Sequence, residues 1–170
     1  MAMEEVILVN EKDEVLGSME KMQAHEKGIL HRAISVFIFN SRKQVLLQRR
    51  ALHKYHSAGL WSNTCCSHPR PGESAASAAK RRLMEEMGMV LELEHKDEFI
   101  YKVALEKGLS EHEYDHVFVG YSEEVPNPNP EEVMDYRWVS IDELNKELHV
   151  HPERYTYWFK LLSDRMAKWL

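Results

Sequence analysis

The segment from Ser74 to Gly88, SAASAAKRRLMEEMG, constrains the fold more than any other part of this chain. Serine is favoured at the start of an α-helix, glycine is common just after its end, and alanine and leucine favour its interior. The segment therefore predicts a helix over 74–87, with one apolar face that must pack against another element. The residues expected on that face are Ala75, Ala79 and Leu83, with Ala76 and Met87 at its edges.

A carboxylate falls on this apolar face. Glu86 lies inside it and Arg82 lies beside it one turn earlier, whereas Lys80, Arg81 and Glu85 point to solvent. Burying a carboxylate is costly unless a cation or hydrogen-bond donors accompany it. Two interpretations follow. The first is an i,i+4 ion pair between Arg82 and Glu86 at the margin of the core, and the second is a site in which Glu86 binds a metal ion and Arg82 binds phosphate.

The spacing of charged residues here resembles the Nudix box, G-x5-E-x7-R-E-U-x-E-E-x-G-U, in which U is aliphatic. Residues 67–89 follow this pattern from Glu73 onward but depart from it at two positions. Ser67 stands at the opening glycine, and Arg82 stands at the glutamate that helps to hold a divalent cation in the hydrolases of that family. The resemblance implies a segment that keeps its shape and its diphosphate binding, with hydrolysis disfavoured.

Most of the remaining chain is expected to form strands. The Pro-containing segment 125–130 cannot carry regular structure, and 51–63 is expected to be loop. The expected strands are 6–10 and 14–21 as an N-terminal hairpin, 33–40 and 44–50 as a second hairpin, and then 96–105, 110–124 and 133–139.

Two helical segments complete the expected fold. A capping box begins a short helix at Ser140, and apolar spacing predicts an amphipathic helix from about residue 153 to the end. The fold class is therefore α+β, an α/β/α sandwich over 1–170 as a single domain. We expect a Nudix-like mixed sheet with a central helix, an N-terminal β-hairpin extension and a C-terminal helix.

Composition excludes several classes of protein. The net charge of −6 argues against a nucleic-acid groove that covers much of the surface. No segment approaches the roughly 20 apolar residues of a membrane span, and MAMEEVILVN does not resemble a signal peptide, so a cytoplasmic location is expected. The only cysteines, Cys65 and Cys66, are adjacent and cannot staple a fold, since a bridge between them would be strained and would close almost no loop.

Glu111 and Glu113 lie two residues apart in an expected strand and therefore on one face. Two close carboxylates raise one another's pKa unless a cation lies between them. The alternative is a solvated strand end. Spacing alone does not separate the two interpretations.

Histidines supply further candidate ligands. His25 and His31 bracket a turn before the strand 33–40, and His68 follows Cys66 by two positions. Together with Glu111 and Glu113 they would form a nitrogen and oxygen site suited to Mn, Zn, Fe or Mg, although a single histidine in such a place is more often an ordinary surface or core residue. The other histidines show no such pattern and are expected to be ordinary: His53, His56, His95, His112, His116, His149 and His151.

These motifs together resemble the type 1 isopentenyl-diphosphate Δ-isomerase family. The resemblance rests on NTCCSHP at 63–69, the Nudix-like helix, EHE at 111–113 and the upstream histidines, and it covers nearly the whole chain. It implies an enzyme of isoprenoid biosynthesis. Such an enzyme interconverts isopentenyl diphosphate and dimethylallyl diphosphate by protonation and deprotonation through a tertiary carbocation.

The resemblance also implies a role for each candidate residue. Cys66 and Glu113 match the catalytic thiol and carboxylate, and Tyr101 matches a tyrosine hydrogen-bonded near that carboxylate. A Mg²⁺ that accompanies the substrate diphosphate is implied at Glu86 and the Cys66 backbone carbonyl. A second divalent metal, Mn²⁺, Zn²⁺ or Mg²⁺, is implied at His25, His31, His68, Glu111 and Glu113. The implied substrate-binding residues are Lys21, Arg50, Lys54 and Arg82 for the diphosphate and Trp158 for the hydrocarbon.

Two departures and two rival functions accompany this interpretation. Cys65 replaces an apolar residue of some members, and Ser67 stands where glycine is frequent. A Nudix diphosphohydrolase would leave Cys66 and the histidines without a role, and a non-catalytic metal-binding domain would tolerate loss of the Cys66 thiol. The expected partner is the small-molecule diphosphate, with no nucleic acid and no membrane, for a monomer or weak dimer.

Overall fold

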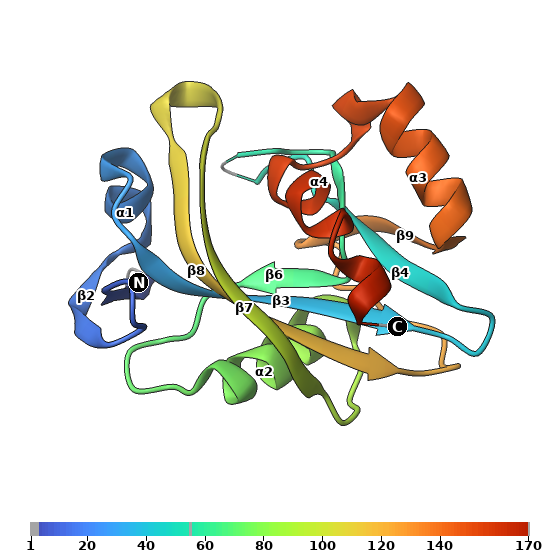
Figure 1. The fold of residues 1–170 in the computed structure, drawn as a ribbon, viewed down its shortest axis with the longest axis horizontal. Coiled ribbons are helices and arrows are strands. Elements are labelled where there is room, and N and C mark those ends of the chain that lie inside the picture. The colour runs from blue at the N-terminus through green and yellow to red at the C-terminus, as the bar shows by residue number, and fades with distance from the viewer. Residues whose placement is uncertain (1–3, 55, 170) are drawn as a thin grey trace.

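The computed structural model describes residues 4–54 and 56–169. Within them, a nine-stranded mixed sheet is covered on one face by helix α2 (Ala75–Met87) and on the other by α3 (Ile141–Val150) and α4 (Tyr157–Ser163) (Figure 1). This layering confirms the predicted α+β sandwich with a mixed sheet. None of the described helices is long and apolar enough to cross a membrane.

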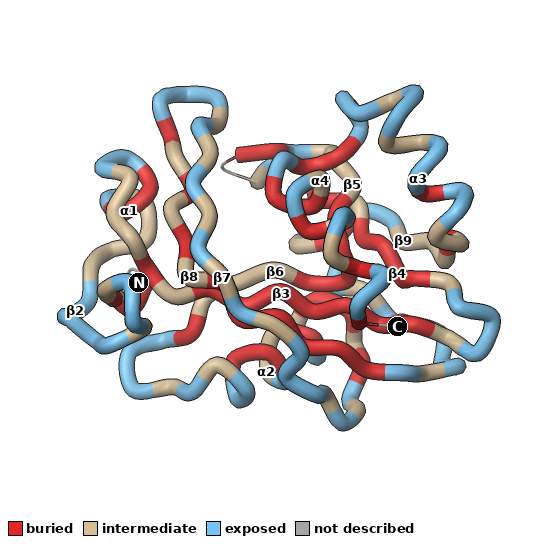
Figure 2. Tube along the Cα trace, in the orientation of Figure 1, coloured by how far each residue is buried: buried red, intermediate tan, exposed pale blue. Residues whose placement is uncertain are grey.

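Strand β3 (His31–Phe39) builds a core on each side of the sheet. Because side chains alternate along a strand, Phe37 and Phe39 pack with α3 and α4, whereas Val36 and Ile38 pack against α2. The strand is buried along nearly its whole length (Figure 2). Such a continuous apolar run is typical of a central strand with both faces covered.

The partners of β3 bring distant parts of the sequence together. It pairs in parallel with β8 (Ser110–Tyr121), so that His31 lies opposite Glu113. It also pairs antiparallel with the short strand β6 (Cys65–Ser67). These two pairings place the cysteine segment and the EHE segment next to β3.

The second expected hairpin is only partly formed. Among the described residues, β3 and β4 (Gln44–Arg50) pair only at Phe39 and Val45, next to the turn. Strand β4 pairs instead along its length with β9 (Val133–Ser140), and with a two-residue strand, β5 (Trp61–Ser62), inside the segment expected to be loop. The two strands and their turn are where the sequence predicts them, but packing decides which strands they pair with.

The other predicted strands are confirmed. The N-terminal hairpin consists of β1 (Glu5–Val9) and β2 (Val15–Glu20), which pair antiparallel. Strand β7 (Glu94–Ala104) pairs antiparallel with β8, and a short 3₁₀ turn, Glu106–Gly108, joins them. Figure 1 shows these two long strands running side by side.

Helix α1 (Lys21–Lys27) was not predicted from the sequence, which indicated a strand end and a turn there. The Glu20 carboxylate accepts hydrogen bonds from the backbone N–H groups of Met22 and Gln23, and Gly28 ends the helix with φ of 63°. Glutamate is not among the preferred N-cap residues, and seven residues give little periodicity. Packing against β8 and β2 therefore determines this helix more than its own sequence does.

Helix α2 begins and ends as expected. The Ser74 hydroxyl accepts a hydrogen bond from the Ser77 backbone N–H at 3.1 Å, and Gly88 has φ of 64°. The expected edge residue Ala76 is exposed, because the helix is rotated so that Ala78 meets the sheet. Its buried residues are Ala78, Ala79, Leu83, Glu86 and Met87.

The Pro-containing segment 125–130 is irregular, as predicted, and docks on the C-terminal end of α2. The backbone N–H of Asn127 donates to the Met87 carbonyl at 2.8 Å, and that of Asn129 donates to the Glu86 carbonyl at 2.9 Å. A Cβ atom at Gly88 would lie 2.4 Å from the Asn127 carbonyl oxygen, so only glycine fits there. This contact fixes the turn of helix that carries Glu86.

The C-terminal part is more broken than expected. Helix α3 is capped by the Ser140 hydroxyl, as the capping box predicts. The continuous helix expected from residue 153 is instead the short helix α4 between two 3₁₀ turns, Pro152–Arg154 and Met166–Lys168. Thr156 caps α4, and Trp158 on its first turn is buried.

Candidate active site

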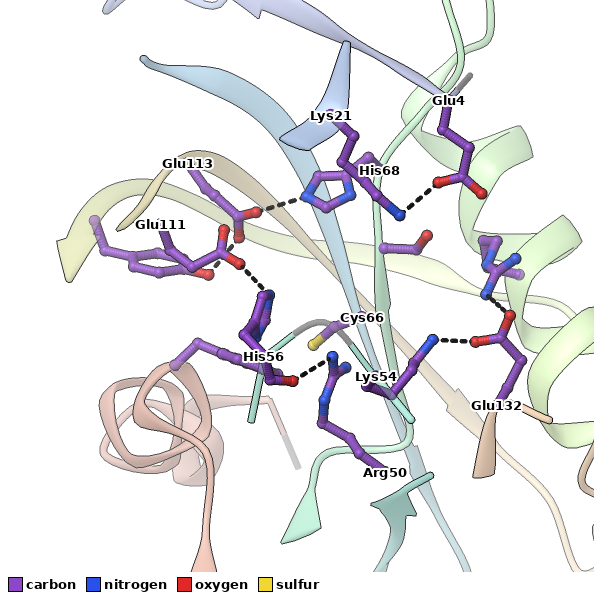
Figure 3. Close-up of a pocket in the computed structure, with 14 residues that line it drawn as sticks. Glu4, Lys21, Arg50, Lys54, His56, Cys66, His68, Glu111, Glu113 and Glu132 are labelled. Carbon is purple, nitrogen blue, oxygen red and sulfur yellow. Dashed lines mark hydrogen bonds and ion pairs between the residues drawn. The ribbon is translucent and has the colours of Figure 1, made fainter. Parts of the chain in front are cut away.

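A pocket collects most of the predicted site residues (Figure 3). In this view the carboxylates of Glu111 and Glu113 lie on one side, Lys21 and Lys54 lie on the other, and Cys66 lies between them. The predicted His25, His31 and Glu86 are not on its wall but are buried. Its lining consists of Lys21, Arg50, Lys54, Cys66, His68, Arg82, Tyr101, Glu111, Glu113 and Trp158, together with Glu4, His56, Ser67 and Glu132.

The five residues implied as metal ligands converge. One nitrogen or oxygen atom from each of them lies within 4.8 Å of the others. Nε2 of His25 is 3.0 Å from Glu111 Oε1, and Nε2 of His68 is 2.8 Å from Glu113 Oε2. Nε2 of His31 is 3.2 Å from Glu113 Oε2. The set is His25, His31, His68, Glu111 and Glu113.

Backbone contacts orient two of these imidazoles. Nδ1 of His25 is 2.7 Å from the Lys21 carbonyl, and Nδ1 of His31 is 2.8 Å from the Ile29 carbonyl. A carbonyl oxygen can only accept, so Nδ1 of each ring donates its proton to that carbonyl, and Nε2 points toward the carboxylates. This is the usual arrangement around a histidine that binds a metal ion.

The charge states of the cluster favour a cation. Burial lowers the pKa of His25 to about 4, and burial also lowers the pKa of His68, so both rings are neutral at pH 7. Burial and the charge of Glu113 raise the pKa of Glu111 well above its usual range. Burial also opposes ionisation of Glu113, but the imidazoles of His31 and His68 outweigh it and hold its pKa well below the usual range. The pair therefore retains one proton, which a divalent cation would displace.

Two buried atoms in this cluster support the same fit. Among the described residues, His31 Nε2 and Glu111 Oε2 meet no partner with good hydrogen-bond geometry, although His31 Nε2 lies 3.2 Å from Glu113 Oε2. Buried polar atoms normally have such a partner. Three imidazoles and two carboxylates suit a divalent cation such as Mn²⁺, Zn²⁺ or Mg²⁺.

The Cys66 thiol is oriented by hydrogen bonds to neighbouring side chains. Its Sγ donates to Asn63 Oδ1 at 3.0 Å and lies 3.5 Å from the Ser35 hydroxyl, which in turn donates to Asp115 at 2.8 Å. Burial and the carboxyl group of Asp115 raise the pKa of the Cys66 thiol. Cys66 is therefore a protonated thiol at neutral pH. Cys65 faces the other side of the sheet, where it is fully buried.

Tyr101 forms a hydrogen bond with Glu113. The two residues lie opposite each other in the register of β7 and β8, and the Tyr101 hydroxyl donates to Glu113 Oε1. Burial and the charge of Glu113 raise the pKa of Tyr101 well above its usual range. The phenol therefore stays protonated and can pass or orient a proton at Glu113.

Cationic side chains form the other side of the pocket. Lys21 Nζ is 2.7 Å from Glu4, and Lys54 pairs with Glu132. Arg82 Nη2 lies 3.5 Å from the same Glu132. Arg50 is the remaining predicted cation, and its guanidinium carbon lies 5.2 Å from the ring centroid of Trp158. Four cations near one another suit an anion with several oxygens, such as a diphosphate.

The structure supports the ion-pair interpretation of Glu86, because its carboxylate is occupied by neighbouring side chains. Its carboxylate is 3.0 Å from Arg82 Nη2 and accepts hydrogen bonds from Cys65 Sγ and Gln48 Nε2, both at 3.1 Å. These donors explain how a carboxylate is tolerated on the buried face of α2. A magnesium-binding role for Glu86 stays a prediction.

His56 was expected to be an ordinary residue, but the structure places it beside the predicted metal ligands. It is buried in the pocket wall, its Nε2 is 3.0 Å from Glu111 Oε1, and its ring meets that of Trp158 edge-on. Burial lowers its pKa to about 2. No spacing in the loop sequence signals this position, because a tertiary contact brings the loop to β8. Asn63, by contrast, stands inside the NTCCSHP motif and could have been singled out.

Comparisons with known proteins show which family this chain resembles. The NUDIX domain family matches residues 29–159. The chain is 53% identical over 166 residues to an isopentenyl-diphosphate Delta-isomerase of Pectobacterium atrosepticum, covering 98% of this chain and 93% of that protein. It is 51% identical over 163 residues to isopentenyl-diphosphate Delta-isomerase 2 of Aromatoleum aromaticum, covering 96% of this chain and 86% of that protein.

A solved structure supports the fold. A protein of Deinococcus radiodurans superposes with a TM-score of 0.80 at 21% identity, covering 95% of this chain and 98% of that one. At this low identity, the match shows only that the two proteins share a fold. The sequence relatives settle the family, and they confirm the resemblance carried by the motifs. The chain therefore belongs to the isopentenyl-diphosphate Delta-isomerase family and contains a NUDIX domain.

Proposed function

We propose that this chain interconverts isopentenyl diphosphate and dimethylallyl diphosphate, with Cys66 and Glu113 as the proton-transferring residues. The observation that carries the proposal is a protonated thiol and a buried carboxylate with its tyrosine, presented in one pocket from separate strands. Cationic side chains line the same pocket. A diphosphate can therefore be held while its hydrocarbon end reaches the proton-transferring groups.

The reaction explains why two such groups are needed. Moving the double bond requires a proton to bind one end of the alkene and another proton to leave a neighbouring carbon. An unactivated alkene is a weak base, and its protonation gives a tertiary carbocation that water would quench. An acid, a base and a dry pocket are therefore required together.

Cys66 Sγ and the Glu113 carboxylate, with Tyr101, fit these two roles. One of these two groups would act as the acid and the other as the base, and their roles would be exchanged in the reverse reaction. The Tyr101 hydroxyl would orient the proton at Glu113 Oε1. A divalent cation held by the three histidines and Glu111 would set the proton affinity of Glu113. The indole of Trp158 would face the cationic hydrocarbon, which is worth about 2 kcal/mol in a desolvated site.

The remaining predicted residues would hold the diphosphate. Lys21 and Lys54 are each paired with an acid at the pocket wall, Glu4 and Glu132. A bound diphosphate would take the place of these acids, and Arg50 and Arg82 would complete its neutralisation. Glu86 lies next to Arg82 and would bind a Mg²⁺ that arrives with the diphosphate.

A Nudix diphosphohydrolase is the rival function, and Arg82 argues against it. The guanidinium ion-pairs with Glu85 and Glu86 at the position where the hydrolase pattern has a metal-binding glutamate. The three histidines and Cys66 would have no task in diphosphate hydrolysis.

The proposals of one domain over 1–170, a monomer or weak dimer, and a cytoplasmic location stay predictions.

Incubation of the purified chain with isopentenyl diphosphate and Mg²⁺ in D₂O, followed by NMR, tests the proposal. We expect dimethylallyl diphosphate carrying deuterium in its new methyl group. Inorganic phosphate without an allylic product would instead identify a hydrolase and overturn the proposal.

A matched pair of cysteine variants tests the thiol. Cys66→Ala should abolish turnover, whereas Cys65→Ala should largely keep it, because Cys65 lies on the other side of the sheet beside Glu86. Both variants should fold, which circular dichroism checks. If Cys66→Ala keeps full activity, the thiol is not the acid or base.

A further inference from the structure

A second cluster of metal-binding side chains lies away from the pocket. His95 and Glu98 of β7 and His116 of β8 bring one ligand atom each within 4.8 Å of the others. Alternation along β8 places His116 on the face of Phe118, which packs with α2, whereas Glu113 faces the pocket. The two clusters are therefore on opposite faces of the sheet.

A β-bulge builds this cluster. Residues three apart in a regular strand point to opposite faces, so His95 and Glu98 would not normally meet. In the register of β7 with β8, a shift between His95 and Asp97 leaves Lys96 as an extra residue, and Glu98 lies opposite His116. The bulge therefore turns His95 onto the face of Glu98, where its ring packs edge-on against Phe118.

A carboxylate behind His116 orients its ring. His116 Nε2 is 2.8 Å from Asp13 Oδ2. Asp13 is itself held by Arg32, whose Nε donates to Asp13 Oδ1 and whose Nη2 donates to the Asp13 carbonyl, both at 2.8 Å. Nε2–H of His116 therefore donates to Asp13, and its Nδ1 lone pair faces the other two residues. Histidines that bind metal ions usually donate their other ring N–H in this way, to a carboxylate, a backbone carbonyl or a water.

The separations fit two ligands of one ion. His116 Nδ1 lies 3.1 Å from His95 Nε2 and 3.5 Å from Glu98 Oε2. With metal–nitrogen distances of about 2.0–2.1 Å, two ligand atoms of one ion lie about 2.9 Å apart at a right angle and about 3.4 Å apart at the tetrahedral angle. His95 and Glu98 are exposed, so an ion can enter from solvent and keep a water ligand.

We infer that this cluster binds a Zn²⁺ ion through His95 Nε2, His116 Nδ1 and a Glu98 oxygen, independently of the isomerase site. Two imidazoles and one carboxylate with a water are a ligand set that Zn²⁺ favours. The ion would join β7 to β8, and His116 connects it through a hydrogen bond to Asp13 in the turn of the N-terminal hairpin. Without an ion, the three residues would be joined only by the hydrogen bond from His95 to His116 and the contact of His116 with Glu98.

Zinc counting by equilibrium dialysis of the full chain tests the inference. Wild type should hold one Zn²⁺ more per chain than His95→Gln or Glu98→Gln, whatever number the pocket holds, because the pocket is unchanged in all three. Both altered residues are exposed, so the variants should fold. His149→Gln, at an exposed histidine of α3, is the matched control and should bind as wild type does. Equal zinc content in wild type and His95→Gln overturns the inference.

Activity and thermal unfolding separate this site from the pocket. His95→Gln should keep the isomerase rate of wild type while losing the ion. Zn²⁺ should raise the Tm of wild type more than that of His95→Gln, since an ion that binds the folded state stabilises it. A variant that loses zinc and activity together would show that the ion belongs to the isomerase site, against the inference.

Discussion

Asn63 should position the Cys66 thiol, and the effect of removing it can be worked out from its contacts. The side chain is fully buried. Its amide nitrogen donates to the Val36 carbonyl at 3.0 Å and the Cys65 carbonyl at 2.9 Å. Its amide oxygen accepts from Ser62 Oγ at 2.9 Å and Cys66 Sγ at 3.0 Å. The two donated bonds orient the amide, so its oxygen must face the thiol.

Asn63→Ala removes all of these contacts. At about 1 kcal/mol net for each hydrogen bond, the four lost bonds lower the free energy of unfolding by about 4 kcal/mol. For a chain of this size that is a fall in Tm of about 8–16 °C. Chemical denaturation measures the first value and calorimetry the second. Asn145→Ala, at an exposed position of α3, is the control and should change stability little.

The same variant should affect kcat more than KM. A freely rotating thiol loses the geometry for proton transfer, so kcat should fall about 10- to 100-fold. The cations that bind the diphosphate belong to other segments, so KM should stay within about 2-fold, well short of the roughly tenfold effect of losing a charged contact.

A double-mutant cycle isolates the thiol contact. In a Cys66→Ala background, Asn63→Ala should lower the free energy of unfolding by about 1 kcal/mol less than in wild type, because the hydrogen bond from the thiol is already absent. If Asn63→Ala leaves kcat unchanged, or if KM rises as much as kcat falls, the positioning role is wrong.

Two further predictions concern the diphosphate and pH. Lys21→Met should raise KM about 10-fold by removing one charge-assisted contact, with Lys12→Met on the exposed hairpin turn as control, and an unchanged KM would exclude Lys21 from substrate binding. For pH, the pKa of His25 is lowered from 6.5 to about 4 by burial, so the unfolded chain binds its proton first as pH falls. Stability should therefore be lost between these values, on the order of 3 kcal/mol for this group. Urea unfolding in a chelator at several pH values measures the loss, and a His25→Gln variant with an equally steep loss would contradict the assignment.

Local periodicity accounts for what could be predicted directly from residues. Helix α2, with Glu86 on its buried face, follows from the 3.6-residue repeat and its end residues. The alternation of β8 places Glu111 and Glu113 on one buried face, as the two-residue repeat requires. Both are properties of a continuous segment, so neither needs knowledge of the rest of the fold.

The ligand set illustrates a different route. Spacing alone left His25, His31 and His68 open to an ordinary role, and the family resemblance supplied the set that the structure then brings together. The resemblance carried no information on His56, which arrives through a loop. Nor did the resemblance indicate that Glu86 is engaged by Arg82; the helical spacing of the two residues offered that pair as one interpretation.

The sequence by itself determined the central helix, most strands, the paired carboxylates and the family to which the chain belongs. Only the tertiary structure decided that β3 and β4 diverge after Val45, that a short helix carries His25, and that a bulge at Lys96 turns His95 toward His116. The physical reason is the range of the interactions. Periodicity and capping act within a few residues, whereas strand partners, bulges and loop contacts depend on the packing of segments far apart in the chain.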